Sequence, residues 1–187
     1  MPVVVAEEGN RRVGGPSRSE MRQCILDIKS WFERQDSDFK CGAPMNDVDF
    51  QRMSKGIDTK LPGALDTLLS EVNGGLWFED KKSMTSDEIL DAIASCESNK
   101  AHGWKQSFIP FACDDVPSTY LVVDVGSGSG EGQVFEFDID DGVEDDAEPV
   151  APSLDNYLEV LRDDMLNGRY EYIEDCGIVE KMGASRK

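Results

Sequence analysis

The sequence has 187 residues, of which 39% are hydrophobic, so it suits one folded domain and excludes wholesale disorder. Its apolar runs are far shorter than the roughly 18 residues of a membrane span, and the N-terminus lacks the pattern of a signal peptide, so we expect a cytoplasmic protein. The 38 acidic and 19 basic residues give a net charge of −19, which argues against nucleic acid or an anionic membrane as the partner.

The N-terminal region predicts a tail followed by one long helix. Residues 1–18 mix Gly, Pro, Arg and Ser without a period, which is typical of a flexible tail. Ser17 and Glu20 then have the spacing of a capping box, and a stripe of apolar residues follows them at helical spacing. We therefore expect a helix and a loop within 19–45.

Two shorter helices are predicted next. Asn46 or Asp47 can cap the first, in which Phe50 and Met53 would share one face. The second starts after Leu61-Pro62, because proline is tolerated in a first helical turn, and it ends before two glycines that supply positive φ.

The rest of the chain predicts mainly strands. The expected elements are a short strand at 76–78, a strand beginning at Met84, a helix capped by Thr85 or Ser86, strands at 108–113, 120–125 and 134–139, a helix capped by Ser153, and a strand at 170–173. Short connections between adjacent strands indicate an α+β fold with a mixed, mainly antiparallel sheet and helices packed against it. The residues expected in one buried core are Leu65, Leu68, Leu69, Phe111, Leu121 and Val123.

No pattern in the sequence fits a catalytic or cofactor site. The glycine-rich stretch 126–132 lacks both the G-x-G-x-x-G frame and a Lys-Ser/Thr pair, so it predicts a hairpin loop. An EF-hand frame on Gly142 would put apolar residues at the first and third ligand positions, although a weak site for a hard cation within 138–148 stays an alternative. His102 is the only histidine, and the five cysteines have no C-x-x-C spacing. We therefore predict no enzyme activity, no metal or cofactor, and free thiols.

The acidic residues are concentrated in 131–164, which holds 13 acids and one base. Such a stretch either keeps the protein soluble or attracts a partner protein with a basic surface. Trp77 and Trp104 are the tryptophans expected to be partly exposed, and an exposed tryptophan is a good interface anchor. The residues predicted to bind a partner are Trp77, Trp104, Asp114, Asp115, Asp138, Asp140, Asp141, Glu144, Asp145, Asp146 and Glu148.

Several motifs occur in the order found in one known superfamily. Leu61-Pro62 followed by Leu69-Ser70-Glu71-Val72-Asn73-Gly74-Gly75 resembles the opening of the SUKH superfamily, the domain of the yeast cell-wall assembly regulator. The other similar segments are Ser86-Asp87-Glu88-Ile89, Trp104 with Phe108-Ile109-Pro110-Phe111-Ala112 and Asp114, Tyr120-Leu121-Val122-Val123-Asp124, Gly132-Gln133-Val134, and 151–158. This resemblance divides the chain into a flexible tail at 1–18, an extra helix and loop at 19–45, a SUKH-like domain at 46–175 and a C-terminal tail at 176–187.

The resemblance implies a domain without catalytic residues that binds other proteins. We expect a protein–protein interaction module, an adaptor or scaffold subunit of a cytoplasmic complex, with cytoskeletal or tubulin-modifying complexes among the candidates. One alternative is an immunity protein that neutralises a toxin nuclease through its acidic face, and another is an enzyme with an unrecognised site. The added first helix favours the adaptor or scaffold, because an immunity protein is usually a bare domain.

Overall fold

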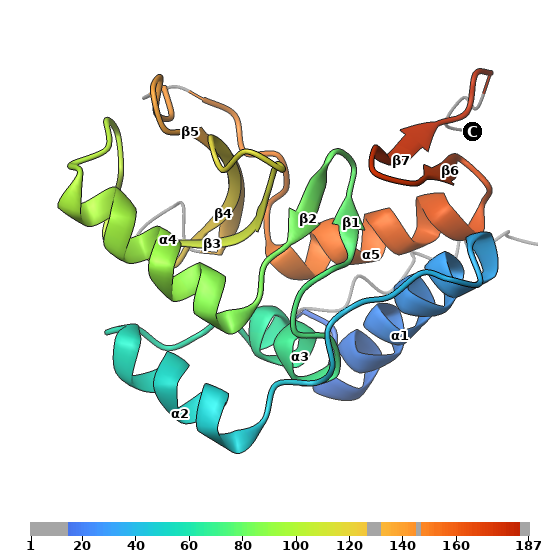
Figure 1. Cartoon of the computed structure of the whole chain (residues 1–187), viewed down its shortest axis with the longest axis horizontal. Coiled ribbons are helices and arrows are strands. Elements are labelled where there is room, and N and C mark those ends of the chain that lie inside the picture. Colours follow the sequence, from blue (N-terminus) through green and yellow to red (C-terminus); the bar gives the residue numbers. More distant parts are fainter. Residues whose placement is uncertain (1–14, 127–131, 145–146, 184–187) are drawn as a thin grey trace, which may run out of the picture.

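The computed structural model describes residues 15–126, 132–144 and 147–183, and Figure 1 shows their arrangement. The helices are α1 (Arg18–Gln35), α2 (Asp47–Gly56), α3 (Gly63–Glu71), α4 (Ser86–Ser98) and α5 (Leu154–Leu166). The strands are β1 (Trp77–Phe78), β2 (Lys81–Ser83), β3 (Phe108–Cys113), β4 (Thr119–Asp124), β5 (Gln133–Asp138), β6 (Tyr170–Ile173) and β7 (Gly177–Glu180).

Strands β1 to β5 form one curled antiparallel sheet in which neighbours in sequence are neighbours in space. The β4–β5 pairing is regular over the whole length of both strands, from Thr119 opposite Asp138 to Asp124 opposite Gln133. In β3 the register shifts between Pro110 and Ala112, which marks a bulge. These observations confirm the prediction of an α+β fold with a mainly antiparallel sheet.

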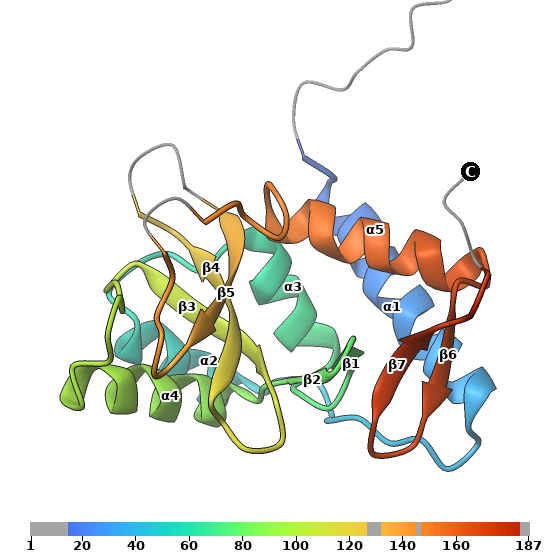
Figure 2. The ribbon, with the colours of Figure 1, turned by 90° about the horizontal axis from the view of Figure 1, so that it is seen from above.

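Helices cover both faces of the sheet, with α4 on one side and α3 and α5 on the other (Figure 2). Because side chains alternate along a strand, Tyr120 and Leu121 of β4 point to opposite faces, and both are buried. The residues predicted for the core are all buried, at 0–4% exposure: Leu65, Leu68, Leu69, Phe111, Leu121 and Val123. The predicted core is confirmed.

Helices α1, α2 and α4 begin at capping residues that the sequence predicts. Ser17 and Glu20 form a capping box at α1, and Thr85 forms one at α4 with Glu88. Asn46 caps α2 through hydrogen bonds that its side chain accepts from two backbone N–H groups. Met53 is buried and Phe50, three residues before it on α2, is 46% exposed, so this face of α2 is covered only in part.

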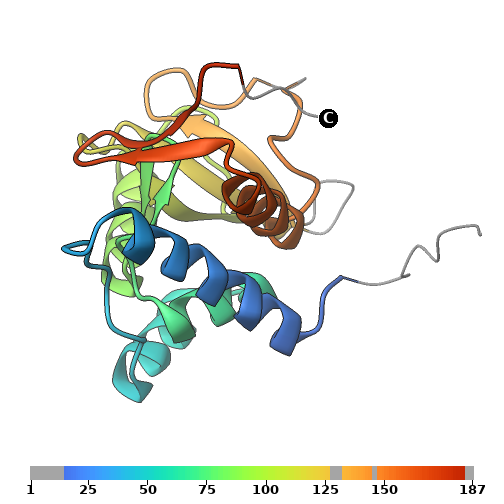
Figure 3. The same ribbon diagram turned by 90° about the vertical axis from the view of Figure 1, so that its right-hand side faces the viewer.

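Helix α1 is part of the main core and packs on α3 and α5 (Figure 3). Its apolar stripe contributes Ile25, Ile28 and Phe32, which are buried in the same cluster as the sheet residues. Arg22 of α1 also donates to Glu71 of α3 at 2.6 Å, and Arg18 pairs with Asp66 of α3 at 3.2 Å. Helix α1, which the sequence predicts as an addition to the SUKH-like domain, therefore packs against that domain and contributes to its core.

The C-terminal segment also differs from the expected tail. Residues of β6 and β7 form a separate two-stranded antiparallel sheet that packs beside β1 and α5. The Ile178 N–H donates to the Glu79 carbonyl at 3.0 Å, and the Ile178 side chain is buried. The prediction of a tail from residue 176 is thus wrong for β7, because this strand is anchored on the β1–β2 turn.

Candidate functional site

The acidic segment 138–148 begins with a turn that Asp138 holds together. The Asp138 carboxylate accepts hydrogen bonds from the backbone N–H groups of Asp140 and Asp141 at 2.8 and 3.1 Å, and from the Thr119 hydroxyl at 3.2 Å. The two backbone hydrogen bonds lower the pKa of Asp138 below its ordinary value. Asp138 therefore shapes the segment from within.

The carboxylates that follow Asp138 face solvent. Asp140, Asp141, Glu144 and Glu148 are exposed, and within the part of the chain that the structure describes none of them forms an ion pair. Asp145 and Asp146 lie outside the described residues. The exposed side chains keep their full charge available to a partner, and their field extends about 8 Å at physiological salt.

A second acidic turn, between β3 and β4, lies beside the first. The Asp114 carboxylate accepts from the Ser118 N–H at 3.0 Å, the Ser118 hydroxyl at 2.9 Å and the Thr119 N–H at 3.2 Å. Burial acts to raise the pKa of Asp114, but these hydrogen bonds outweigh it and lower the pKa. Asp115, the next residue, is exposed.

Thr119 joins the two turns into one surface. Its N–H donates to Asp114 and its hydroxyl donates to Asp138, while the Ile139 N–H donates to the Ser118 carbonyl at 2.9 Å. We name this region the acidic surface; its exposed carboxylates are Asp115, Asp140, Asp141, Glu144 and Glu148. The structure thus brings together two groups of predicted binding residues that are more than 20 positions apart in the sequence.

The two tryptophans predicted to be exposed are differently placed. Trp77 is 4% exposed and lies under the Lys82 ammonium group, which is 5.2 Å from its ring centre, so the expected exposure of Trp77 is wrong. Trp104 is half-buried and packs edge-on against Phe108 and Phe137. Its indole N–H is buried and lacks a hydrogen-bond partner within the described residues.

The loop that carries Trp104 touches the acidic segment. A side chain at Gly142 would come within 2.7 Å of the His102 carbonyl oxygen, and Gly142 has a φ of +76°. Only glycine meets both demands, the close approach and the left-handed backbone. Gly142 therefore fixes the acidic segment against the α4–β3 loop.

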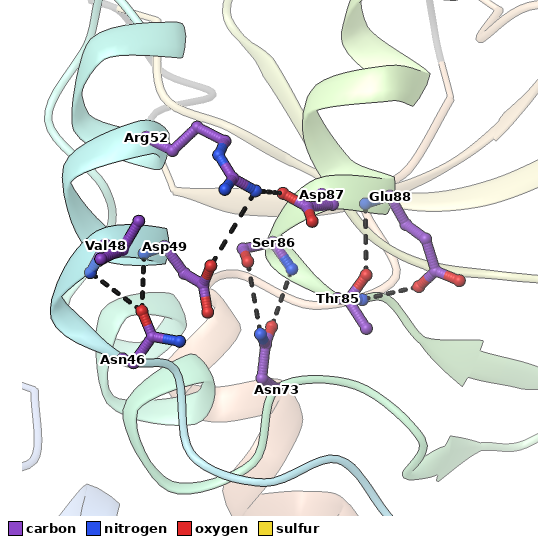
Figure 4. Close-up of polar contacts among 9 residues, drawn as sticks. All are labelled: Asn46, Val48, Asp49, Arg52, Asn73, Thr85, Ser86, Asp87 and Glu88. Carbon is purple, nitrogen blue, oxygen red and sulfur yellow. Dashed lines mark hydrogen bonds and ion pairs between the residues drawn. The ribbon is translucent and has the colours of Figure 1, made fainter.

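The motif residues that resemble the SUKH opening form a structural junction (Figure 4). The Asn73 side chain accepts from the Ser86 N–H at 2.7 Å and its amide donates to the Ser86 hydroxyl at 3.3 Å. Arg52 of α2 pairs with Asp87 of α4 at the same place. These contacts tie the turn after α3 to the first turn of α4, so the motif positions the sheet and helices.

A groove of about 400 Å³ lies between this junction and the β3–β4 turn. Its walls include Gly74, Lys82 and Asp114, together with the thiols of Cys41 and Cys113. Burial raises the pKa of both thiols, that of Cys113 to about 11, so both are protonated at neutral pH and are poor nucleophiles.

Two further observations limit the kinds of site. Among the described residues, no group of three His, Cys, Asp or Glu side chains is arranged to hold a metal ion. Over the same ranges, none of the helices has the length and apolar character needed to cross a membrane.

The fold defines an α+β protein in which helices cover both faces of a curled antiparallel sheet. Residues 44–160, more than half of the chain, match the SMI1 / KNR4 family (SUKH-1), and the chain belongs to this family. A comparison with curated proteins found no match. Membership of this family is compatible with a protein-interaction role or an immunity-protein role.

Proposed function

We propose that the protein is a non-catalytic interaction module, an adaptor or scaffold subunit of a cytoplasmic complex, whose acidic surface recruits a partner with a basic surface. One observation carries this proposal: the two linked turns and the segment that follows the second carry five exposed carboxylates, and within the described residues none of the five forms an ion pair with a basic side chain. Like charges held close together repel each other, so a surface of this kind is stabilised when a basic protein covers it.

The arrangement separates structural acids from exposed ones. Asp114 and Asp138 use their carboxylates to hold the turns, whereas Asp140, Asp141 and Glu144 accept no hydrogen bond from another side chain of the described chain. The exposed acids can therefore be neutralised without disturbing the fold. This separation gives the proposal a clean test.

The test compares capture of partners by three forms of the full chain. The acidic-surface variant is Asp140→Asn with Asp141→Asn and Glu144→Gln; its matched control is Glu171→Gln with Glu174→Gln and Asp175→Asn, all exposed and on the β6–β7 hairpin. Quantitative mass spectrometry of pull-downs should show a basic protein that the wild type and the control retain and the acidic-surface variant loses. Equal recovery of every captured protein by both variants would contradict the proposal.

The acidic surface also supports a second candidate, an immunity protein that covers the basic cleft of a toxin nuclease. The observation is the same group of exposed carboxylates, which presents negative charge as a nucleic-acid backbone does. If the captured partner is a nuclease, the wild-type chain should inhibit its cleavage of DNA or RNA. Inhibition that is unchanged by the acidic-surface variant would exclude this candidate.

A further inference from the structure

Helix α5, the β1–β2 turn and the β6–β7 hairpin are neighbours in the fold (Figure 1). Residues from all three line a small pocket. Its volume is about 230 Å³, below the roughly 300–1,000 Å³ of pockets that enclose small-molecule ligands. The size fits a single side chain of another protein. Its wall includes Glu79, Val150, Tyr157, Val160, Asp164 and Tyr170.

The pocket adjoins the end of the acidic segment. Val150 comes two residues after Glu148, and the Val150 N–H donates to the Val134 carbonyl of β5 at 2.8 Å. A basic protein held at the acidic surface would therefore have the pocket within reach. Val150 and Val160 are 52% and 40% exposed, and they form an apolar rim at the surface.

The charge around the pocket is negative. The described wall contains two carboxylates, Glu79 and Asp164, and no basic side chain. Lys81 is buried between Asp80 and Glu136 at 3.1 and 3.2 Å, and Arg169 pairs with Asp164 at 2.9 Å.

Glu79 remains without a cationic partner among the described residues. It lines the pocket together with the two tyrosines, Tyr157 and Tyr170. Burial raises the pKa of Tyr157 and of Tyr170, and the Glu79 carboxylate is the charged group that adds most to each shift. A cation beside Glu79 would lie in a wall that also holds the side chains of Tyr157 and Tyr170. The Arg169 guanidinium already lies 5.8 Å from the Tyr170 ring centre, which shows that this ring accepts a cation on its face.

We propose that this pocket, which we name the Glu79 pocket, binds a lysine or arginine side chain of the basic partner. The apolar rim would contact the methylene groups of that side chain, and Glu79 would pair with its charged end. This inference rests on the proposed function, which supplies the basic character of the partner. The side chain that enters the pocket belongs to the partner. An acidic side chain would be repelled by the Glu79 carboxylate, and an apolar one would form no ion pair with it.

NMR spectra of the ¹⁵N-labelled full chain test the pocket without the partner. The probes are the N-acetyl methylamides of lysine, arginine and norleucine, of which norleucine has the lysine stem without the charge. The lysine or arginine probe should give saturable chemical-shift changes at the amides of Glu79, Val160 and Tyr170. The norleucine probe should bind about tenfold more weakly, because it lacks one charge-assisted contact. The stronger of the two basic probes identifies the preferred side chain.

Two variants and one control make the test specific. Glu79→Gln should weaken lysine or arginine binding about tenfold, and Val160→Trp, which fills the rim from an exposed helix position, should abolish it. Glu171→Gln, which neutralises an exposed acid of the hairpin that does not line the pocket, should leave it unchanged. Equal binding by all four forms, or shifts confined to the acidic segment, would overturn the inference while leaving the proposed function to its own test.

Discussion

Replacement of Phe32 by alanine tests whether α1 is part of the core. The Phe32 side chain is 0% exposed, and its ring stacks on Phe39 with centroids 4.7 Å apart. It also meets Trp31 and Tyr172 edge-on at 5.1 and 5.5 Å. Truncation of a buried phenylalanine to alanine lowers the free energy of unfolding by about 3–5 kcal/mol. Because Phe32 also loses three aromatic contacts, we expect a loss in the upper half of this range, about 4–5 kcal/mol.

The measurement is urea unfolding followed by far-UV circular dichroism, which gives the free energy of unfolding and its dependence on urea. Glu33→Ala is the matched control on the same helix, because Glu33 is exposed and its pair with Lys29, at 4.0 Å, is worth less than about 0.5 kcal/mol. A loss below about 1 kcal/mol for Phe32→Ala would refute the packing of α1 into the core.

Two further substitutions test the junction and the acidic turns. Asn73→Ala should lower the free energy of unfolding by about 1–3 kcal/mol in urea titrations, because the buried Ser86 N–H loses its acceptor. Asp114→Asn should destabilise the protein at neutral pH. Because hydrogen bonds lower the folded-state pKa of Asp114, its contribution is present above the unfolded pKa of about 3.9 and is lost as the pH falls through the folded pKa. Thermal unfolding from about pH 7 to pH 2 should show the wild-type and variant curves converging on acidification.

Matched controls exist for both substitutions. Asn99→Ala removes an exposed side chain whose amide donates to the Ser95 hydroxyl at 3.3 Å, and it should change stability by less than about 0.5 kcal/mol. Asp115→Asn neutralises an exposed acid next to Asp114 and should leave the pH dependence of unfolding nearly unchanged. Equal effects of Asn73→Ala and Asn99→Ala, or of the two aspartate changes, would contradict the structural roles assigned here.

Much of the fold is predictable because it follows local chemistry. The capping boxes at Ser17 and Thr85 and the run of β-forming residues at 120–125 depend on near neighbours in sequence. Strands β2 and β7 are short and carry charged residues, so their sequences give little signal. The register with β3, which is distant in sequence, defines β2, and β2 ends before Met84. Strand β7 pairs with its neighbour β6 and is also anchored by the Ile178 N–H, which donates to the carbonyl of the distant Glu79.

The candidate site is less predictable. Asp138 and Asp114 appear in the sequence as two acids among 38, although an aspartate just before backbone donors in a turn is a known pattern that could have indicated their structural role. Trp77 lies in a strand of two residues, too short for its pattern to show which side is buried. The wall of the Glu79 pocket comes from segments 79, 150–164 and 170, and only the fold brings these together.

The central claim is that the acidic surface recruits a basic partner by charge. The most direct measurement is the association rate constant of the captured partner over a range of salt concentrations, for the wild type and for the variant with Asp140→Asn, Asp141→Asn and Glu144→Gln. Exposed charges act mainly on association, so the variant should associate about three- to tenfold more slowly at low salt, with a flatter salt dependence and a nearly unchanged dissociation rate. Identical association rates and salt slopes for the two proteins would contradict the account.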